Sequence, residues 1–140
     1  MNDIVVNKIQ SIPRCILRAR EEFAADPDGF DTNFTRQDAA ILNILRASEQ
    51  SIDLANYVIK TRKLGIPVST AESFDLLQIH GAIGSDLAGR LRGMVGFRNA
   101  VVHRYQRTDM VLVRKVIELG RDDLIAFGDA MLANLAEKAN

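Results

Sequence analysis

The stretch RQDAAILNILRASEQSIDLANYVI, residues 36–59, decides the fold class of this chain. Its apolar side chains recur every three or four residues, which places them on one face of an α-helix. These residues are Ile41, Ile44, Leu45, Ile52, Ala55, Val58 and Ile59. The pattern predicts a helix from about residue 35 to about residue 61. Thr35 is expected to be its N-cap, with Asp38 placed favourably for the helix dipole.

The same helical spacing extends to both sides of this stretch. Further helices are expected over residues 2 to about 25, from about residue 70, from Ser85 or Asp86, and from 110 to about 138. Residues 69–72, Ser-Thr-Ala-Glu, have the form of a capping box, and Asp109 is expected to cap the last helix. No segment alternates with period two, so no sheet is expected. The sequence therefore predicts an all-α fold, an up-and-down bundle of four to five helices, in a single domain over residues 1–140.

Composition limits the partners that the chain can bind. Its 140 residues include 47% hydrophobic side chains, enough for one sizeable core. With 18 basic and 18 acidic residues the net charge is zero, so any contact with nucleic acid must come from a local patch. The single cysteine, Cys15, excludes an internal disulfide and fits a reducing cytosol. The N-terminus lacks the layout of a signal peptide, and no run approaches the roughly 18 apolar residues of a membrane helix, so a cytoplasmic protein is expected.

A second stretch, GFRNAVVHRYQR at residues 96–107, concentrates polar chemistry at the end of the fourth predicted helix. Residues 85–107 carry several arginines against a single acid, Asp86. These arginines are Arg90, Arg92, Arg98, Arg104 and Arg107. Charge alone favours an ordinary explanation, in which arginines near a helix C-terminus interact favourably with the dipole. The alternative is a local positive field beside His103 that binds a phosphate backbone.

His103 and Arg98 together have the chemistry needed to cleave RNA without a metal. A histidine that titrates near neutrality moves protons, and an arginine stabilises charge that develops on phosphate oxygens. The 2′-hydroxyl would attack the adjacent phosphate, a reaction closed to DNA. The chain has only two histidines and one cysteine, without metal-ligand spacing, so we expect no metal site and no cofactor. His80 is expected to lie at a helix end rather than to act as a ligand.

Helical geometry raises a difficulty for this pair. Asn99 and His103 lie one turn apart on one face, but Arg98 and His103 lie about 140° apart around a straight helix. Either the helix ends before His103, or a second copy in a symmetric dimer supplies the missing group. Three glycines in the same helix each cost about 1 kcal/mol relative to alanine, and close packing of another helix is the expected reason for them. They are Gly89, Gly93 and Gly96.

The second predicted helix carries two carboxylates, Glu49 and Asp53, close in sequence to Arg46. Pairing of these charges within the helix is the expected arrangement. The alternative is that they orient the site formed by Arg98 and His103.

The site stretch resembles a known family. Arg98, four intervening residues, His103 and then Tyr105 resemble the Arg-X4-6-His-X-Tyr motif of the HEPN superfamily, in the form found in the HepT toxins of HepT/MNT toxin–antitoxin modules. Residues 36–59 resemble the second helix of this family, and MVGFRNAVVHRY resembles its site region. The resemblance extends over roughly residues 35 to 127, most of the chain.

The resemblance implies a helical homodimer with the site in the dimer cleft, acting as a metal-independent endoribonuclease. It implies catalytic roles for Arg98 and His103 and a supporting role for Asn99. It also implies an antitoxin partner, an MNT-type nucleotidyltransferase that transfers AMP to Tyr105. AMP groups at this tyrosine would occupy the phosphate site and repel RNA.

Two interpretations of function stay open. The first is the endoribonuclease toxin of a type VII-like module. In that case four further arginines are candidates for RNA contact: Arg90, Arg92, Arg104 and Arg107. The second is a non-enzymatic helical adaptor or substrate-binding subunit of a nucleotidyltransferase, for which the motif is a docking surface.

Overall fold

The computed structural model describes residues 3–103 and 110–139, without the side chains at 102, 103, 119 and 137–139. Within this part of the chain it consists of helices, with no strand. They are α1 (Asp3–Ala25), a 3₁₀ turn η1 (Phe30–Thr32), α2 (Phe34–Arg62), α3 (Thr70–Ile79), α4 (Ser85–His103) and α5 (Met110–Ala139). The all-α expectation is confirmed. No helix in the described ranges has the length and apolar character needed to cross a membrane.

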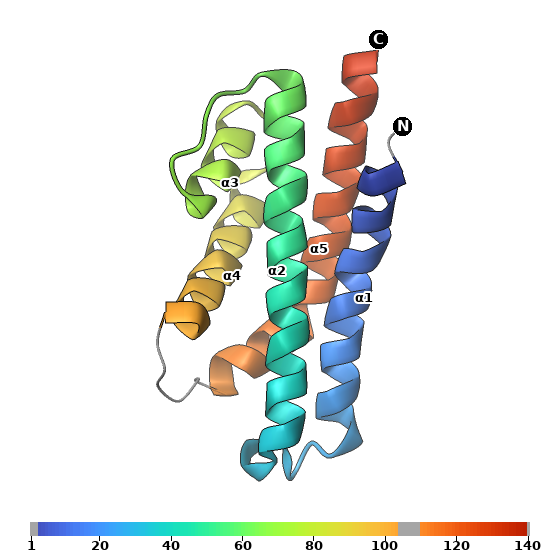
Figure 1. The fold of residues 1–140 in the computed structure, drawn as a ribbon, viewed down its shortest axis with the longest axis vertical. Coiled ribbons are helices and arrows are strands. Elements are labelled where there is room, and N and C mark those ends of the chain that lie inside the picture. Colours follow the sequence, from blue (N-terminus) through green and yellow to red (C-terminus); the bar gives the residue numbers. More distant parts are fainter. Residues whose placement is uncertain (1–2, 104–109, 140) are drawn as a thin grey trace.

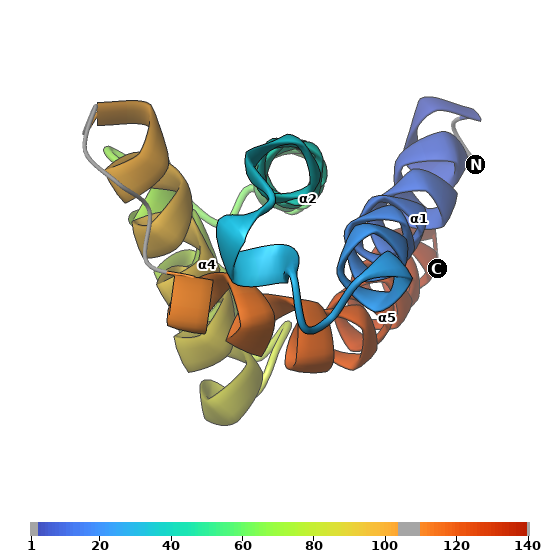
Figure 2. The same ribbon diagram turned by 90° about the horizontal axis from the view of Figure 1, so that it is seen from below.

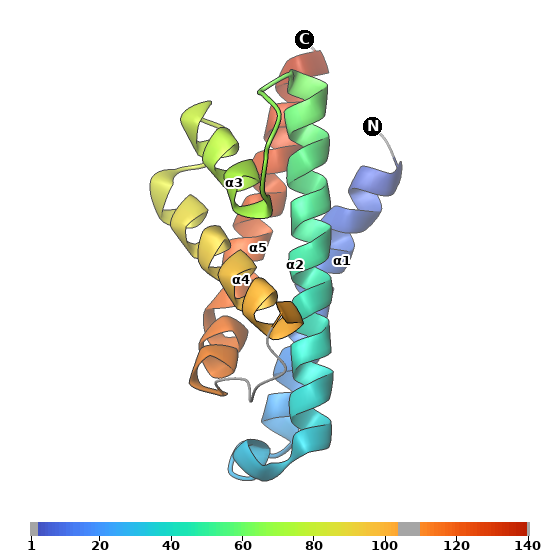
Figure 3. The same cartoon turned by 60° about the vertical axis from the view of Figure 1, so that its left-hand side comes forward.

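α2 is the central helix of the bundle (Figures 1 and 2). α1 packs along one side of it, and α5 packs against both α1 and α2. α3 and α4 pack against each other and lie on the other side of α2 (Figure 3). Each of the other α-helices therefore contacts α2, the helix with the clearest apolar stripe in the sequence.

The largest fully buried side chains come from all the helices and from η1. They are Ile12, Ile16, Phe30, Ile44, Leu54, Ile59, Phe74, Leu77, Leu91, Ile117, Leu124 and Phe127. Burying one apolar side chain of this size contributes roughly 1.5–3 kcal/mol. Phe74 of α3 and Phe127 of α5 meet edge to face with their ring centroids 5.8 Å apart, which joins α3 to α5 across the core.

The N-cap of α2 differs from the expected one. Asn33, not Thr35, caps the helix, because its side chain accepts a hydrogen bond from the backbone N–H of Arg36 at 3.1 Å. The η1 turn just before it leaves Asn33 in an extended conformation, so that α2 begins at Phe34. Asparagine caps a helix at least as well as threonine, so local preference does not oppose the shift. Asp38 consequently lies beyond the first turn.

The other helix ends follow the sequence more closely. Ser69 caps α3 as expected and accepts a hydrogen bond from the N–H of Glu72 at 3.2 Å. The Glu72 carboxylate reaches one residue past the cap, to the N–H of Val68 at 3.4 Å. At the end of α2, Lys63 takes the left-handed conformation with a φ of 56°. The expected cap of α5, Asp109, lies outside the described residues.

The N-terminal part of α5 runs at an angle to the rest of the helix (Figures 1 and 3). In the first third of α5, the carbonyls of Ile117 and Glu118 accept hydrogen bonds from the Arg20 guanidinium of α1 at 3.0 and 3.2 Å. The bend turns the start of α5 toward the side of the bundle on which α4 lies (Figures 1 and 2).

One charged cluster joins α1 to α2. Glu22 of α1 accepts hydrogen bonds from Arg18 on its own helix and from Arg36 of α2, the latter at 3.0 Å. The hydrogen bond from Arg18, together with the charges of both arginines, lowers the pKa of Glu22 below its ordinary value, against the opposing effect of desolvation. The carboxylate form of this residue is therefore favoured by folding.

Acid should weaken the folded state partly through Glu22. A carboxyl whose pKa falls on folding stabilises the fold fully above its ordinary pKa of about 4.3, and this stabilisation is lost as the pH falls through the lower folded-state pKa. In Glu22→Gln, the unfolding free energy should therefore fall less between neutral pH and about pH 3 than in the wild type. Urea unfolding measures this difference. The control is Glu21→Gln, whose exposed carboxylate lies 3.6 Å from Arg18, and equal acid losses in Glu22→Gln and wild type would contradict the prediction.

Candidate active site

Arg98 lies near the end of α4 and contacts both α2 and its own helix. Its Nε donates a hydrogen bond to Oε1 of Glu49 on α2, and its Nη1 donates to Oδ1 of the neighbouring Asn99 at 2.7 Å. The Arg98 side chain is 22% exposed, so part of it is open to solvent. Three of the five N–H groups of a guanidinium are not used by these two bonds. The arrangement presents an oriented cation with further donors, which suits a phosphate group.

α4 continues through His103, so the alternative in which the helix ends before this residue is wrong. Positions 98 and 103 therefore lie about 140° apart around the helix. The Arg98 guanidinium nevertheless extends around α4 to Asn99, which lies one turn before position 103 on the same face. The structure thus brings Arg98 and Asn99 together, while the side chain of His103 lies outside what it describes.

The glycines of α4 do not pack against another helix of the same chain, and this expectation is wrong for the single protomer. A Cβ added at Gly93 or Gly96 would meet no atom within 4 Å, and one at Gly89 would meet only the end of the Arg92 side chain at 3.8 Å. All three glycines are exposed. At about 100° per residue, Gly96 and Gly89 lie about 20° and about 40° from position 103 around the helix, and Gly93 lies about 80° from it. The exposed glycines of α4 therefore lie on the side of the helix that carries position 103, together with Arg92 and Asn99.

The predicted RNA-binding arginines of α4 do not form one patch. Arg90 donates from Nε to Asp123 of α5 at 2.8 Å. Arg92 points to a different neighbour and donates to Asp75 and Gln78 of α3 at 2.9 and 3.0 Å. Each of these cations is therefore matched by a carboxylate of a different helix. Three further predicted residues lie outside the described part of the chain: Arg104, Tyr105 and Arg107.

The carboxylates of α2 bond to other helices, and the expected pairing within α2 is wrong. Asp53 accepts a hydrogen bond from Lys8 of α1 at 3.3 Å. Glu49 accepts a hydrogen bond from Arg98 of α4, the contact that a role in orienting the predicted site would require. The sequence does not distinguish pairing within α2 from a bond to another helix. Charges one turn apart on a helix predict a local pair whether or not another helix lies alongside.

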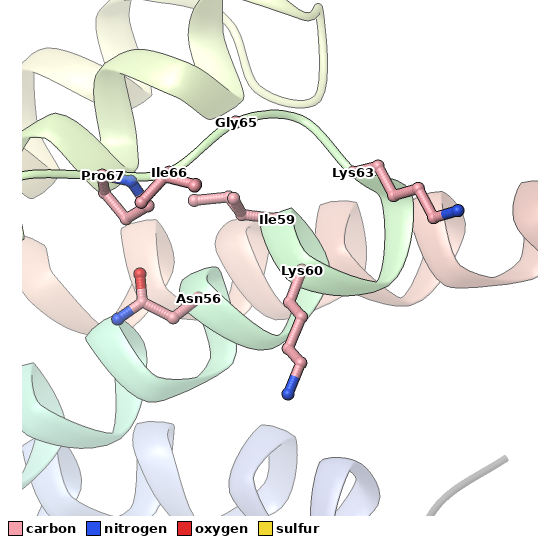
Figure 4. A pocket seen from close by; sticks show the side chains of 7 residues that line it. All are labelled: Asn56, Ile59, Lys60, Lys63, Gly65, Ile66 and Pro67. Carbon is pink, nitrogen blue, oxygen red and sulfur yellow. The ribbon is translucent and has the colours of Figure 1, made fainter.

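A hollow of about 470 Å³ lies elsewhere, between the end of α2 and the loop that leads to α3 (Figure 4). It is lined by Asn56, Ile59, Lys60, Lys63, Gly65, Ile66 and Pro67. The first of these residues is about two turns of α2 beyond Glu49. No site residue that the structure describes lines this hollow. Among the described residues, no three His, Cys, Asp or Glu side chains are grouped so that they could hold a metal ion.

The chain is similar in sequence and structure to proteins of one kind. The family model "Ribonuclease HepT-like" matches residues 12–131. Over 133 residues the chain is 41% identical to the mRNA nuclease HepT of Shewanella oneidensis, and this match covers 95% of this chain and 99% of that protein. A solved structure of a tri-AMPylated Shewanella oneidensis HEPN toxin in complex with MNT antitoxin matches with a TM-score of 0.87 and 41% identity, over 95% of this chain and 99% of that one. A toxin–antitoxin crystal structure with AMP-PNP matches with a TM-score of 0.85 and 40% identity, over 94% and 99% of the two chains.

Proposed function

Because the chain belongs to the HepT-like ribonuclease family, we propose that it is a metal-independent endoribonuclease toxin of the cytoplasm, paired with an MNT-type nucleotidyltransferase antitoxin. The observation that carries this proposal is the Arg98 guanidinium, which is partly exposed and oriented by two acceptors, one of them Asn99, the residue one turn before position 103. A non-enzymatic adaptor would not need a partly exposed guanidinium of the motif to be held by two acceptors.

The proposed reaction uses the 2′-hydroxyl of RNA as the nucleophile. Its oxygen forms a bond to the adjacent phosphorus while the bond from phosphorus to the 5′-oxygen breaks, which gives a cyclic phosphate and a free 5′-hydroxyl. Arg98 stabilises the charge that develops on the phosphate oxygens. His103 of one copy takes the proton of the 2′-hydroxyl, and the protonated His103 of a second copy donates a proton to the leaving 5′-oxygen.

A symmetric homodimer would bring two such segments into one cleft. The exposed glycine face of α4 supports this part of the proposal, because backbones approach most closely where side chains are absent. Position 103 lies on this face, so a contact there carries both histidines to the interface. Asn99 lies beside the same face and accepts from the Arg98 guanidinium, which links the cation to the interface.

The antitoxin is proposed to act on Tyr105, two residues beyond His103 in the chain. The similar toxin from Shewanella oneidensis is tri-AMPylated and bound to an MNT antitoxin. AMP groups on Tyr105 would place phosphates beside Arg98 and compete with RNA for its donors. The four other arginines stay candidates for RNA contact: Arg90, Arg92, Arg104 and Arg107.

Cleavage of RNA without a divalent metal is the direct test of the mechanism. Purified protein in EDTA should cut a labelled RNA, and Arg98→Ala or His103→Ala should lower the rate by about 100-fold or more. A DNA of the same sequence should stay intact because it lacks the nucleophile. Gel analysis of the products measures both results. Loss of cleavage in EDTA, or a His103→Ala variant as fast as the wild type, would exclude this mechanism.

Gly93→Glu should separate the dimer into stable monomers without ribonuclease activity. Position 93 is open in the protomer, so the substitution strains nothing there and improves helix propensity by up to about 1 kcal/mol. Across a two-fold interface, the paired carboxylates repel and the added side chains hold the helices apart. Analytical ultracentrifugation and a thermal melt measure assembly and fold, with Gly93→Ala as the matched control. A dimeric, fully active Gly93→Glu protein would overturn the proposed interface.

Modification of Tyr105 can be tested apart from RNA cleavage. Co-expression with the cognate nucleotidyltransferase should raise the mass of the chain by whole multiples of the AMP group and abolish its ribonuclease activity. Tyr105→Phe removes the hydroxyl that accepts AMP, so its mass should stay unchanged. Intact-protein mass spectrometry decides the result, and an AMP adduct that persists in Tyr105→Phe would place the modification on another residue.

A further inference from the structure

We propose that Glu49 of α2 is a positioning residue for Arg98, an inference that rests on the proposed ribonuclease function. Its carboxylate holds one edge of the guanidinium, so that the remaining N–H groups face a bound phosphodiester. Glu49 lies outside the motif that carries the resemblance, 49 residues before Arg98 in the chain. In this proposal Glu49 contacts no reacting atom of the RNA and acts only through Arg98.

Two acceptors on two different helices define the orientation of the guanidinium. Nε donates to Oε1 of Glu49 on α2, and Nη1 donates to Oδ1 of Asn99 on α4 at 2.7 Å. The guanidinium is planar and its donors are fixed in that plane, so two bonds on adjacent nitrogens set the direction of the others. The second N–H of Nη1 and both N–H groups of Nη2 are left for a phosphate, which arginine binds through paired donors.

Glu49 itself stands on a rigid part of α2. Its neighbours Ser48 and Ser51 are fully buried, and their hydroxyls donate to backbone carbonyls of the preceding turn at 2.9 and 2.7 Å. Ile52, one turn after Ser48, is also buried. The carboxylate is 48% exposed, so it lies at the surface while its backbone is held by the core. A group supported in this way keeps a neighbouring side chain in place better than one on a loop.

The sign of its charge distinguishes positioning from simple attraction of RNA. A carboxylate beside a phosphate site repels the substrate, so Glu49 does not help RNA to bind. Its benefit must appear in the transition state, where a displaced cation costs most. Removal of Glu49 should therefore lower kcat without raising KM. A smaller folded fraction would lower the apparent kcat in the same way, so a thermal melt of each variant must show that it is fully folded.

Steady-state cleavage of a short RNA by Glu49→Ala and Glu49→Gln tests this inference. Glu49→Ala should reduce kcat by about 10- to 100-fold with KM unchanged or lower. Glu49→Gln keeps an oxygen acceptor for Nε and should recover most of kcat. Asp53→Ala is the matched control, since it removes a carboxylate one turn further along α2 that bonds to Lys8 and not to Arg98, and it should leave kcat unchanged.

A second pair of measurements shows whether the effect passes through Arg98. Lysine has no Nε–H group in the position that Glu49 holds, so Glu49→Ala should have little further effect on kcat in an Arg98→Lys background. In the wild type, NMR should show a slowly exchanging Arg98 Nε–H that is lost in Glu49→Ala and kept in Glu49→Gln.

The possible failures are distinguishable. An active wild type with an unchanged kcat in Glu49→Ala overturns the positioning role alone. Faster cleavage by both Glu49→Ala and Glu49→Gln also overturns it, because the carboxylate would then only slow the reaction by repelling the RNA phosphates. A wild type that cuts no RNA, while RNA-binding and NMR data show a folded protein, overturns the proposed function and this inference with it.

Discussion

The burial of one face of α2 is the constraint on which the rest of this structure depends. This helix contacts each of the other α-helices, and polar side chains can lie on its buried face only if they are hydrogen-bonded there. Ser48 and Ser51 meet that requirement by donating to the carbonyls of Ile44 and Ala47, and their small size lets neighbouring helices approach closely. The buried face of α2 then keeps Glu49 at a fixed place beside α4, where it bonds to Arg98 of the predicted site.

A chain with zero net charge can still carry a functional cation, because the arginines of α4 are matched one at a time. Arg90 bonds to α5, Arg92 to α3 and Arg98 to α2. Exposed ion pairs of this kind contribute only about 0–1 kcal/mol each, so they are not what holds the bundle together. Arg98 is the least exposed of the three, at 22% against 51% and 35%, and it alone has a second acceptor on its own helix. The proposed chemistry therefore relies on one oriented guanidinium and not on a broad positive field.

The sequence predicts the helices well because helix formation depends on the spacing of residues that are close in the chain. The apolar stripe of α2 and the cap at Ser69 both follow from neighbours within one or two turns. The spacing does not predict Asn33 as a cap, because the η1 turn that sets its conformation has only three residues and no periodic signal. The bond from Glu49 to Arg98 was undecided for a different reason. It depends on how α2 and α4 cross, and residues separated so far along the chain carry no local sign of that angle.

The glycines of α4 connect the fold to the proposed assembly. Three glycines within one helix cost about 3 kcal/mol relative to alanine, a large share of the 5–15 kcal/mol that stabilises an ordinary domain. Nothing in the described part of the protomer offsets this cost, since the space around Gly93 and Gly96 is open. A contact with a second copy would offset it, and the same contact lies on the face of position 103. In the proposed dimer, the weaker helix at that place is offset by the interface formed there. The low stability of the isolated helix and the completion of the proposed site would then both follow from the glycines of α4.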